Sequence, residues 1–312
     1  MNKFLEKDIS TRKAFSKAIT DIGLEDERIF TIAADSESRF GEFVEKASDR
    51  ALNIGIAEQN SMSIAAGLAF CGKIPFVSTY ATFLTMRACE QIRTDIAFAG
   101  LNVRIVGTNT AFSSGWLGFT HQALEDIGIV RAIPKMTIVV PADGEATYQL
   151  VKKSVEYEGP LYIRIRGKDK EPHISSKEKI EIGKARILED GNDITLIACG
   201  RMVYEALLAA KNLSSRGISV RVIDMHTIKP IDKNAVLAAA EETKGIITIE
   251  EHNIYGGLGS SVAEITSSTN PTKVKRLGIK DDFGVPGTQK DLMEHFKLNA
   301  ENITAEAVNF LK

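Results

Sequence analysis

Residues 52–72 read LNIGIAEQNSMSIAAGLAFCG and place a short strand pattern directly before a helical pattern. Nearly every residue of this stretch is apolar or small, and Glu58 is its single carboxylate. If LNIG is a strand, Glu58 lies just beyond the carboxyl end of that strand, in the first turn of a helix. Open parallel sheets bind ligands at that edge. Glu58 is therefore a candidate functional residue; the simpler alternative is a carboxylate that satisfies free N–H groups at the helix start.

The same alternation of strand and helix patterns continues along the chain. Runs rich in β-branched residues, separated by amphipathic segments, occur at 28–35, 51–55, 74–80, 102–109, 136–141, 161–166, 194–200, 220–228, 245–252 and 273–279. Strands that alternate with helices predict mostly parallel sheets with helices on both faces. The expected fold class is α/β, with two doubly wound domains.

One polar segment, GKDKEPHISSKEKIEIG at 167–183, lacks hydrophobic periodicity and is the best candidate for a linker. We place a first domain at 1–170, the linker at 171–185 and a second domain at 186–312. A chain of 312 residues is long enough for two domains of ~150 residues each.

The composition excludes several classes of partner. With 39 Lys and Arg against 41 Asp and Glu, the net charge of -2 favours neither nucleic acid nor an anionic membrane. The three cysteines are widely separated and predict neither a disulfide framework nor a metal site. The first residues are charged without an apolar core, and no apolar run is long enough to cross a bilayer. We expect a cytoplasmic protein.

Four long motifs then identify a family. NIGIAEQN, AAGLAFCGKIPFVSTYATF, GFTHQALEDIGIVRAIPKMTIVVPADG and EEHNIYGGLGSSVAE occur in this order. They resemble the pyrimidine-binding and C-terminal domains of the transketolase family, and several ordered motifs are more specific than one glycine fingerprint. The resemblance extends from about Ser10 to the end of the chain. The opening STRKAFSKAI is similar to the transketolase version of this module rather than to the related deoxyxylulose-phosphate synthases or 2-oxo acid dehydrogenase β-subunits.

The resemblance implies thiamine diphosphate chemistry at Glu58. In this family the matching Glu hydrogen-bonds a ring nitrogen of the cofactor's aminopyrimidine and so promotes loss of the thiazolium proton. Desolvation favours the protonated carboxyl that this task requires, whereas the helix start opposes it; we expect desolvation to dominate. Tyr80, Phe83 and Met86 would hold the pyrimidine ring, the two aromatic residues by stacking. Taken alone, such residues more often serve core packing.

Two further residues match catalytic positions of the family. His121, in FTHQALED, corresponds to a His that contacts the reacting oxygen of the substrate; its alternative is a helix-start residue. Asp35 corresponds to an Asp near the positively charged thiazolium ring, and a surface loop carboxylate is the alternative.

A pair of arginines matches the sugar-phosphate clamp of transketolases. Arg12 and Arg166 occupy those positions, and a guanidinium suits the task through its planar fork of donors. Arg164, two residues before Arg166, could substitute for it. Each arginine taken alone would more often be a surface charge.

Three positions depart from an ordinary transketolase. Leu117 replaces an Asp that recognises a sugar hydroxyl, Asn109 replaces a His that contacts substrate phosphate, and Arg39 replaces a phosphate-contacting Ser. Loss of a buried hydroxyl partner removes strong discrimination between substrates. We therefore expect ketol transfer with an unusual anionic sugar, either branched or ending in a group other than phosphate, held by Arg12, Arg39 and Arg166.

The diphosphate-binding domain of transketolases is missing from the sequence. No GDG segment followed by an Asn is present, and EDGND (189–193) and ADGEA (142–146) fit turn and helix-start chemistry instead. GGLGSS (256–261) is expected to serve close packing. The resemblance thus implies one half of a split transketolase. An N-terminal partner subunit would share the thiamine diphosphate, hold its Mg²⁺ and form a heterotetramer of two copies of each chain.

The predicted function is transfer of a two-carbon ketol unit from a ketose phosphate, or a related anionic sugar, to an aldose. Within enzymes, the alternative is a deoxyxylulose-phosphate synthase-like or decarboxylating 2-oxo acid dehydrogenase β-like subunit. From another class comes a non-catalytic paralogue that only binds a partner.

Overall fold

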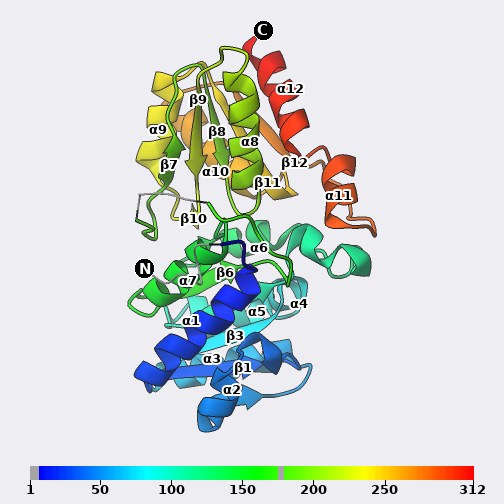
Figure 1. The fold of residues 1–312 in the computed structure, drawn as a ribbon. Helices are drawn as coiled ribbons and strands as arrows, with labels where there is room; N and C mark the ends of the chain where they lie inside the picture. Colours follow the sequence, from blue (N-terminus) through cyan, green and yellow to red (C-terminus); the bar gives the residue numbers. More distant parts are fainter. Residues whose placement is uncertain (1–6, 175–178) are drawn as a thin grey trace.

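The computed structural model describes residues 7–174 and 179–312. Figure 1 shows two lobes stacked on one another, each built from a sheet with helices on both faces. The α/β class expected from the sequence is confirmed, and each of the predicted strand runs contains a strand. Within the described residues, no helix is both long enough and apolar enough to span a bilayer.

The first sheet has seven strands. In spatial order they are β10 (Thr227–Lys229), β5 (Thr137–Val139), β6 (Leu161–Arg164), β4 (Arg104–Thr108), β3 (Ile74–Tyr80), β1 (Ile29–Ala33) and β2 (Ala51–Asn53). All pair in parallel except β10, which is antiparallel to β5. The central strands β3, β4 and β6 are almost entirely buried, in keeping with a parallel sheet covered on both faces.

Helices cover this sheet on both sides. One core cluster joins α1 (Thr11–Glu25), α2 (Phe43–Lys46) and α7 (Gly144–Ser154) to one face. Another joins α3 (Glu58–Phe70), α4 (Ala81–Arg87) and α6 (Asp126–Ala132) to the opposite face. Shorter helical segments complete the lobe: η1 (Glu37–Arg39), η2 (Ser48–Arg50), α5 (Cys89–Gln91), η3 (Ile92–Ala97) and η4 (Ala111–Leu117).

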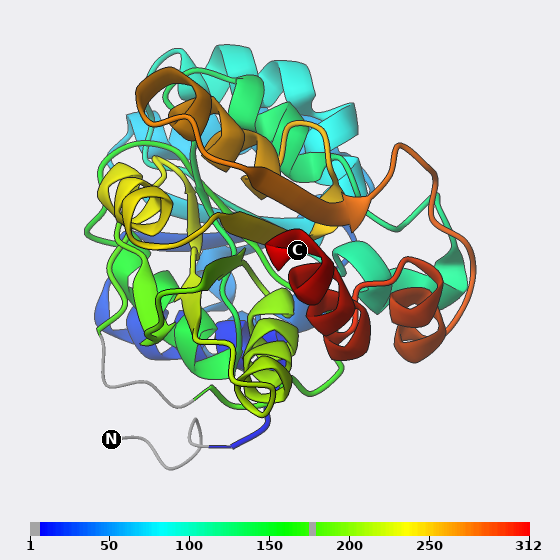
Figure 2. The same ribbon diagram turned by 90° about the horizontal axis from the view of Figure 1, so that it is seen from above.

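The second sheet has five strands, in the order β12 (Val274–Ile279), β11 (Ile246–Asn253), β8 (Ile194–Ala198), β9 (Val220–Asp224) and β7 (Arg186–Glu189). Only β7 runs antiparallel to its neighbour within the described strands. Its helices are α8 (Met202–Ser214), α9 (Lys233–Glu242), α10 (Leu258–Thr269), α11 (Gln289–His295) and α12 (Ala300–Leu311). Seen from above in Figure 2, α12 (red) lies on one side of this sheet and α10 (orange) on the other.

The two lobes are joined by more than the connecting segment. The β10 strand falls in the predicted second domain but completes the edge of the first sheet. One core cluster also continues from the first lobe into the second and includes Tyr162, Ile223 and Val262. The predicted linker at 171–185 lies partly outside the described residues, and three of its described members, Glu171, Ile174 and Ile180, are buried. The lobes therefore pack as one body.

Candidate active site

Parallel pairing brings the sequence-predicted residues to one edge of the first sheet. Asp35, Tyr80, Asn109 and Arg166 follow or end β1, β3, β4 and β6, and Glu58 opens α3 after β2. Because these strands run in parallel, their carboxyl ends meet at the same edge, where open α/β sheets bind ligands.

Glu58 lies in a nearly water-free environment at this edge. It is 4% exposed although it occupies the first residue of α3. Rather than capping its own helix, the carboxylate accepts a hydrogen bond from Arg87 Nη1 at 3.1 Å. The same guanidinium lies over the ring of Phe83, 4.0 Å from its centre. Glu58 is thus buried beside a flat cationic group that both donates to it and stacks on an aromatic face.

Three rings form a cluster next to Glu58. The His121 ring meets Tyr80 and Phe83 edge to face, with centres 5.1 and 5.0 Å away. Tyr80 and Phe83 contact one another at 5.7 Å. Thr120 Oγ1 lies 2.9 Å from His121 Nδ1, and Thr82 donates to the His121 backbone carbonyl. The structure therefore brings together the predicted His121, Tyr80 and Phe83.

Two arginines continue the cluster on the other side of Tyr80. Arg39 is 4% exposed, lies over the Tyr80 ring at 4.9 Å and donates from Nε to Thr108 Oγ1 at 2.7 Å. Arg12 donates to Ser38 Oγ at 2.9 Å. Burial and the positive charge of Arg12 lower the pKa of Arg39 to about 10, so Arg39 stays cationic at neutral pH.

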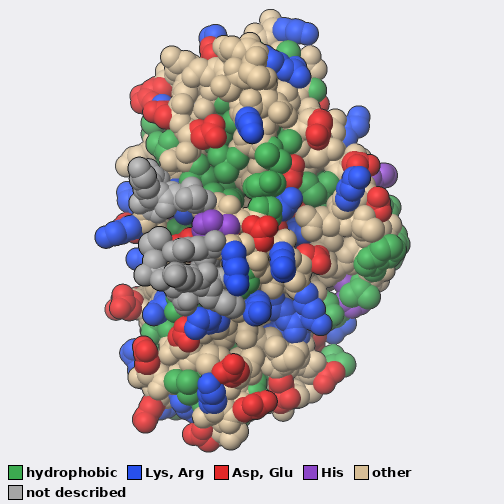
Figure 3. All heavy atoms as spheres, viewed as in Figure 1, with side chains coloured by type: hydrophobic (Ala, Val, Ile, Leu, Met, Phe, Trp, Pro, Cys, Tyr) green, Lys and Arg blue, Asp and Glu red, His purple; other side chains and the backbone are tan. Residues whose placement is uncertain are grey.

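Among the described residues, no carboxylate is found among the groups that perturb Arg12 and Arg39. Tyr80 perturbs Arg12 electrostatically, and Arg12 and Tyr80 perturb Arg39. Two neighbouring guanidiniums repel one another unless an anion lies between or beside them. The arrangement favours an anionic ligand at this point. Figure 3 shows Lys and Arg side chains gathered on this face near the level where the lobes meet.

The remaining predicted residues lie around the cluster. Asp35 is exposed and Met86 is 42% exposed on the last turn of α4. Leu117, at the end of η4, is 50% exposed. Asn109 has its Oδ1 buried without a hydrogen-bond partner. Asp35 and Asn109 both have positive φ, 53° and 57°, a conformation that non-glycine residues adopt at a cost and that is concentrated at functional sites.

Arg166 makes contacts within the chain that the sequence did not predict. Its guanidinium donates from Nε to Glu171 at 2.7 Å, from Nη1 to Glu251 and from Nη2 to Gln289 at 2.6 Å. All three nitrogens are therefore engaged inside the chain. Its backbone N–H donates to Thr11, the neighbour of Arg12. Arg166 fastens the first lobe to the second through these contacts, which engage three of its five N–H donors.

Arg164 is likewise engaged inside the chain. Its Nε donates to Asp126 at 2.8 Å, and its Nη2 donates to the carbonyls of Ala123 and Glu251. Asp126 also accepts from the Tyr162 hydroxyl at 2.7 Å. Arg164 is thus a structural residue at the junction of the lobes.

The GGLGSS segment serves packing, as predicted. The N–H groups of Leu258 and Gly259, at the start of α10, donate to the two carboxylate oxygens of Glu250 at 2.7 and 2.8 Å. A Cβ at Gly257 would lie 2.0 Å from Glu250 Oε2. The helix start is therefore filled by the chain's own carboxylate and is closed to a phosphate.

Glu250 predicts a pH-dependent stability. Burial raises the pKa of Glu250 from 4.5 to about 7. The carboxyl ionises at a lower pH in the unfolded chain, so its contribution to the free energy of unfolding is complete below pH 4.5 and is lost as pH rises through 7. At ~1.4 kcal/mol per pKa unit, the decline amounts to a few kcal/mol.

Denaturant unfolding at several pH values checks this prediction. Glu250→Gln should remove the decline between about pH 5 and 7. Glu241→Gln, which changes an exposed carboxylate on α9, is the matched control and should keep it. Equal slopes for the wild type and Glu250→Gln would contradict the assignment.

The two segments with acidic residues beside glycine, ADGEA (142–146) and EDGND (189–193), form a helix start and a turn. Asp143 caps α7 by accepting from Ala146, and Gly191 packs against the backbone of Val220. Within residues 7–174 and 179–312, no group of three or more His, Cys, Asp or Glu side chains is placed to hold a metal ion.

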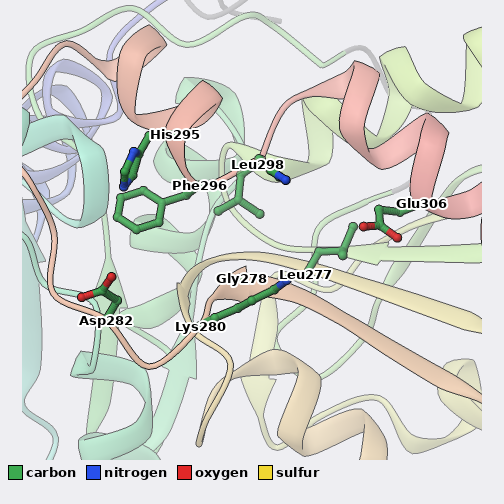
Figure 4. A pocket seen from close by; sticks show the side chains of 9 residues that line it. Leu277, Gly278, Lys280, Asp282, His295, Phe296, Leu298 and Glu306 are labelled. Atoms are coloured by element: carbon green, nitrogen blue, oxygen red, sulfur yellow. The ribbon is translucent and has the colours of Figure 1, made fainter.

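A separate pocket lies in the second lobe. It has a volume of about 250 Å³ and is lined at the end of β12 and around α11 and α12 by residues that include Lys280, His295 and Phe296. Figure 4 shows these side chains around the opening. None of the predicted site residues lines it.

The sequence comparisons decide the family. The model of the transketolase pyrimidine binding domain matches residues 7–169, and that of the transketolase C-terminal domain matches residues 183–303. The chain belongs to the transketolase family. A subunit of the apulose-4-phosphate transketolase of Phocaeicola vulgatus is 40% identical over 308 residues, covering 97% of this chain and 98% of that protein. The 6-deoxy-6-sulfo-D-fructose transketolase subunit SqwH of a Clostridium species is 37% identical over 298 residues, covering 95% and 92%.

A solved structure agrees with these relatives. "Split gene transketolase, inactive beta4 tetramer" matches with a TM-score of 0.88 at 39% identity, covering 97% of this chain and 98% of that one. The present chain therefore stands with the split transketolases. Membership of the transketolase family implies dependence on thiamine diphosphate.

The residues of the cluster fit the pyrimidine half of that cofactor. Arg87 already presents a flat donor group to Glu58 while stacked on Phe83, which are the two contacts expected of an aminopyrimidine ring. Its side chain is 50% exposed, so it can move aside. The sequence pattern did not predict Arg87 or Thr108 at this site, because a charge or hydroxyl at a strand or helix end has no distinctive spacing.

Proposed function

We propose that this chain is the C-terminal subunit of a two-chain, thiamine-diphosphate-dependent transketolase that moves a two-carbon ketol unit from an anionic ketose to an aldose. The single observation that carries the proposal is the arrangement at the carboxyl edge of the first sheet. There Arg87 links a buried Glu58 to Phe83, the rings of Phe83, His121 and Tyr80 contact one another, and Arg39 lies over Tyr80. Among the described residues, no carboxylate is found among the groups that perturb Arg39 or the neighbouring Arg12.

Each residue has a distinct task in this proposal. Glu58 shares a proton with the pyrimidine ring nitrogen, and its burial keeps water from competing for that hydrogen bond. Tyr80, Phe83 and Met86 enclose the ring. Asp35 lies at the next strand end and offers negative charge toward the thiazolium. When bound, thiamine diphosphate supplies the carbon nucleophile that accepts the ketol unit.

His121 acts on the substrate. Its ring edge is fixed between Tyr80 and Phe83, and Thr120 holds Nδ1. Nε2 is then directed to exchange a hydrogen bond or a proton with the oxygen of the ketose whose charge changes in the reaction. An imidazole suits this task because histidine side chains in general can take up and release a proton near neutral pH.

A partner subunit completes the site. We propose that it carries the diphosphate-binding domain, holds the Mg²⁺ and shares the cofactor in a heterotetramer of two copies of each chain. Several large apolar side chains are exposed on this chain and would be covered by a partner. They are Ile56 (72% exposed), Phe70 (84%), Phe98 (80%) and Trp116 (76%). Exposed aromatic and aliphatic groups of this size mark protein contact surfaces. The two relatives compared above are likewise named as subunits.

The substrate is an anionic ketose of unusual shape. Arg12 and Arg39 would hold its terminal phosphate or sulfonate, with Asn109 beside them; Arg166, engaged internally, is left out of the grip. Leu117 presents an apolar side chain where ordinary transketolases recognise a hydroxyl, which favours a branched or deoxygenated sugar. The related subunits are named for apulose 4-phosphate and 6-deoxy-6-sulfo-D-fructose, and these names specify a phosphate and a sulfo group.

Turnover by the reconstituted pair of subunits tests the proposal. Donors to compare are xylulose 5-phosphate, apulose 4-phosphate and 6-deoxy-6-sulfofructose, each with ribose 5-phosphate as acceptor, because glyceraldehyde 3-phosphate would only regenerate xylulose 5-phosphate. We expect one of the latter two donors to have the highest kcat/KM. Preference for xylulose 5-phosphate and ribose 5-phosphate would overturn the substrate assignment. Consumption of pyruvate with release of CO₂ would favour the decarboxylating alternative, and a tight but inactive complex would favour a non-catalytic paralogue.

A further inference from the structure

Two segments far apart in the sequence meet beside His121. Residues 115–122 lead from η4 into His121, and residues 283–289 lead from β12 into α11 in the second lobe. Figures 1 and 2 show η4 and α11 side by side at one edge of the molecule. The contacts between these two segments connect the second lobe to the candidate active site.

Gln122 makes the central connection. It is 2% exposed, and its Nε2 donates to the carbonyls of Gly115 at 3.2 Å and Val285 at 2.9 Å. The Gly287 N–H donates to the Gly115 carbonyl at 3.2 Å. A buried side-chain amide that bridges two backbone segments holds both, because a lost partner would leave a buried polar group unsatisfied.

Glycines permit the close approach. A Cβ at Gly284 would lie 1.4 Å from Gln122 Oε1, and a Cβ at Gly115 would lie 2.2 Å from the Gly287 carbonyl oxygen. Gly115 therefore meets the backbone of Gly287 directly, and the backbone at Gly284 lies against the Gln122 side chain. These contacts thus fix their separation closely.

Both ends of the contact are anchored. Phe112 of η4 stacks on Phe296 beyond α11, with ring centres 5.4 Å apart and planes 10° apart. Phe296 also lines the pocket of Figure 4. Gln289, the first residue of α11, accepts from Arg166 at 2.6 Å. Phe119 of the first segment also contacts Phe283 of the second. The start of α11 is therefore tied to the first lobe on several sides.

His121 depends on this arrangement for its position. The N–H groups of His121 and Gln122 both donate to the Gly118 carbonyl, at 3.0 and 3.2 Å, so residues 118–122 form a compact turn. Gln122, next to His121, fastens that turn to the second lobe. A shift of Gln122 would move the His121 ring against Tyr80 and Phe83.

We propose that the second lobe is part of the catalytic machinery, because residues 284–287 hold His121 in place through Gln122. Gln122 is a positioning residue: it acts on the reacting atoms through His121. The proposal extends the function proposed above and rests on it for the reaction, but the coupling between the two segments is measurable without any reaction.

Hydrogen–deuterium exchange on the isolated chain measures the coupling. Gln122→Met keeps the length of the side chain and removes its hydrogen bonds. We expect faster exchange in both 115–122 and 283–289, with the sheets unchanged. Gln149→Met, on α7 and outside both segments, is the matched control. Faster exchange in only one segment, or in neither, would overturn the proposal, and this holds even if the reconstituted wild type shows no ketol transfer.

Kinetics of the reconstituted enzyme separate positioning from simple stability. Gln122→Met should lower kcat by about tenfold or more, with little change in KM for the ketose, because misplacement of a catalytic group acts on the reaction step. Gly284→Ala should give the same effect from the other lobe. The double variant should be no worse than the more impaired single variant, since both changes break one contact. Unchanged kcat in both variants, or fully additive losses, would contradict the proposal.

Discussion

Glu58→Gln is expected to lower ketol transfer by the reconstituted enzyme by about 10²- to 10⁴-fold, the usual contribution of a positioned acid–base group. Gln keeps the size of Glu and can still accept from Arg87, so the fold should be preserved. An amide cannot share a proton with the pyrimidine ring nitrogen. The loss should therefore appear in kcat, while the melting temperature of the chain changes little.

A matched control separates this effect from a general change of charge. Glu90→Gln removes an exposed carboxylate from α5, outside the ring cluster, and should leave kcat within about twofold, as is usual for surface substitutions. The measurement is the single-turnover rate of ketol transfer in the presence of thiamine diphosphate. Wild-type rates for Glu58→Gln would mean that the carboxylate only fills a helix start.

Arg39→Gln is expected to raise KM for the anionic ketose by about 10- to 100-fold, because a charge-assisted hydrogen bond to an anion contributes ~1.5–3 kcal/mol. Arg39 is buried against Tyr80 and Thr108 and has no carboxylate among the groups that perturb it within the described residues. Its positive charge is therefore available to a ligand. The effect on kcat should be smaller than the effect on KM.

Initial-rate kinetics across ketose concentrations give both constants. Arg28→Gln is the control, because Arg28 is a surface arginine paired with Asp26 and 58% exposed. It should leave KM unchanged. For a ketose without an anionic end, the wild type and Arg39→Gln should have the same KM. An unchanged KM for the charged ketose would exclude Arg39 from the grip.

The sequence predicted the α/β fold because the evidence for it is local. The central strands are buried on both faces and are rich in apolar and β-branched residues, as in IPFVSTY, which is β3 from end to end. The sequence pattern did not reveal β7, because that four-residue strand has a mixed burial pattern at the edge of its sheet. The pairing of β10 with β5 was also missed, since only the packing of one lobe on the other brings these strands together.

Part of the candidate site could likewise be predicted from the sequence, and part could not. The place of Glu58 follows from a strand that passes into a helix, and the cluster of Tyr80, Phe83 and His121 follows from matching motifs. The engagement of Arg166 could not be predicted, because its acceptors Glu251 and Gln289 lie 85 and 123 residues away in the sequence. An arginine at a strand end has the same local pattern whether it faces solvent or acceptors from a distant part of the chain.

The most direct test of the central claim is a crystal structure of the reconstituted enzyme with thiamine diphosphate and Mg²⁺. The account predicts a Glu58 carboxylate oxygen within about 2.6–3.2 Å of a pyrimidine ring nitrogen. It also predicts that the guanidinium of Arg87 has left the face of Phe83 to admit the ring. A pyrimidine ring bound away from Glu58, with Arg87 still paired to that carboxylate, would contradict it.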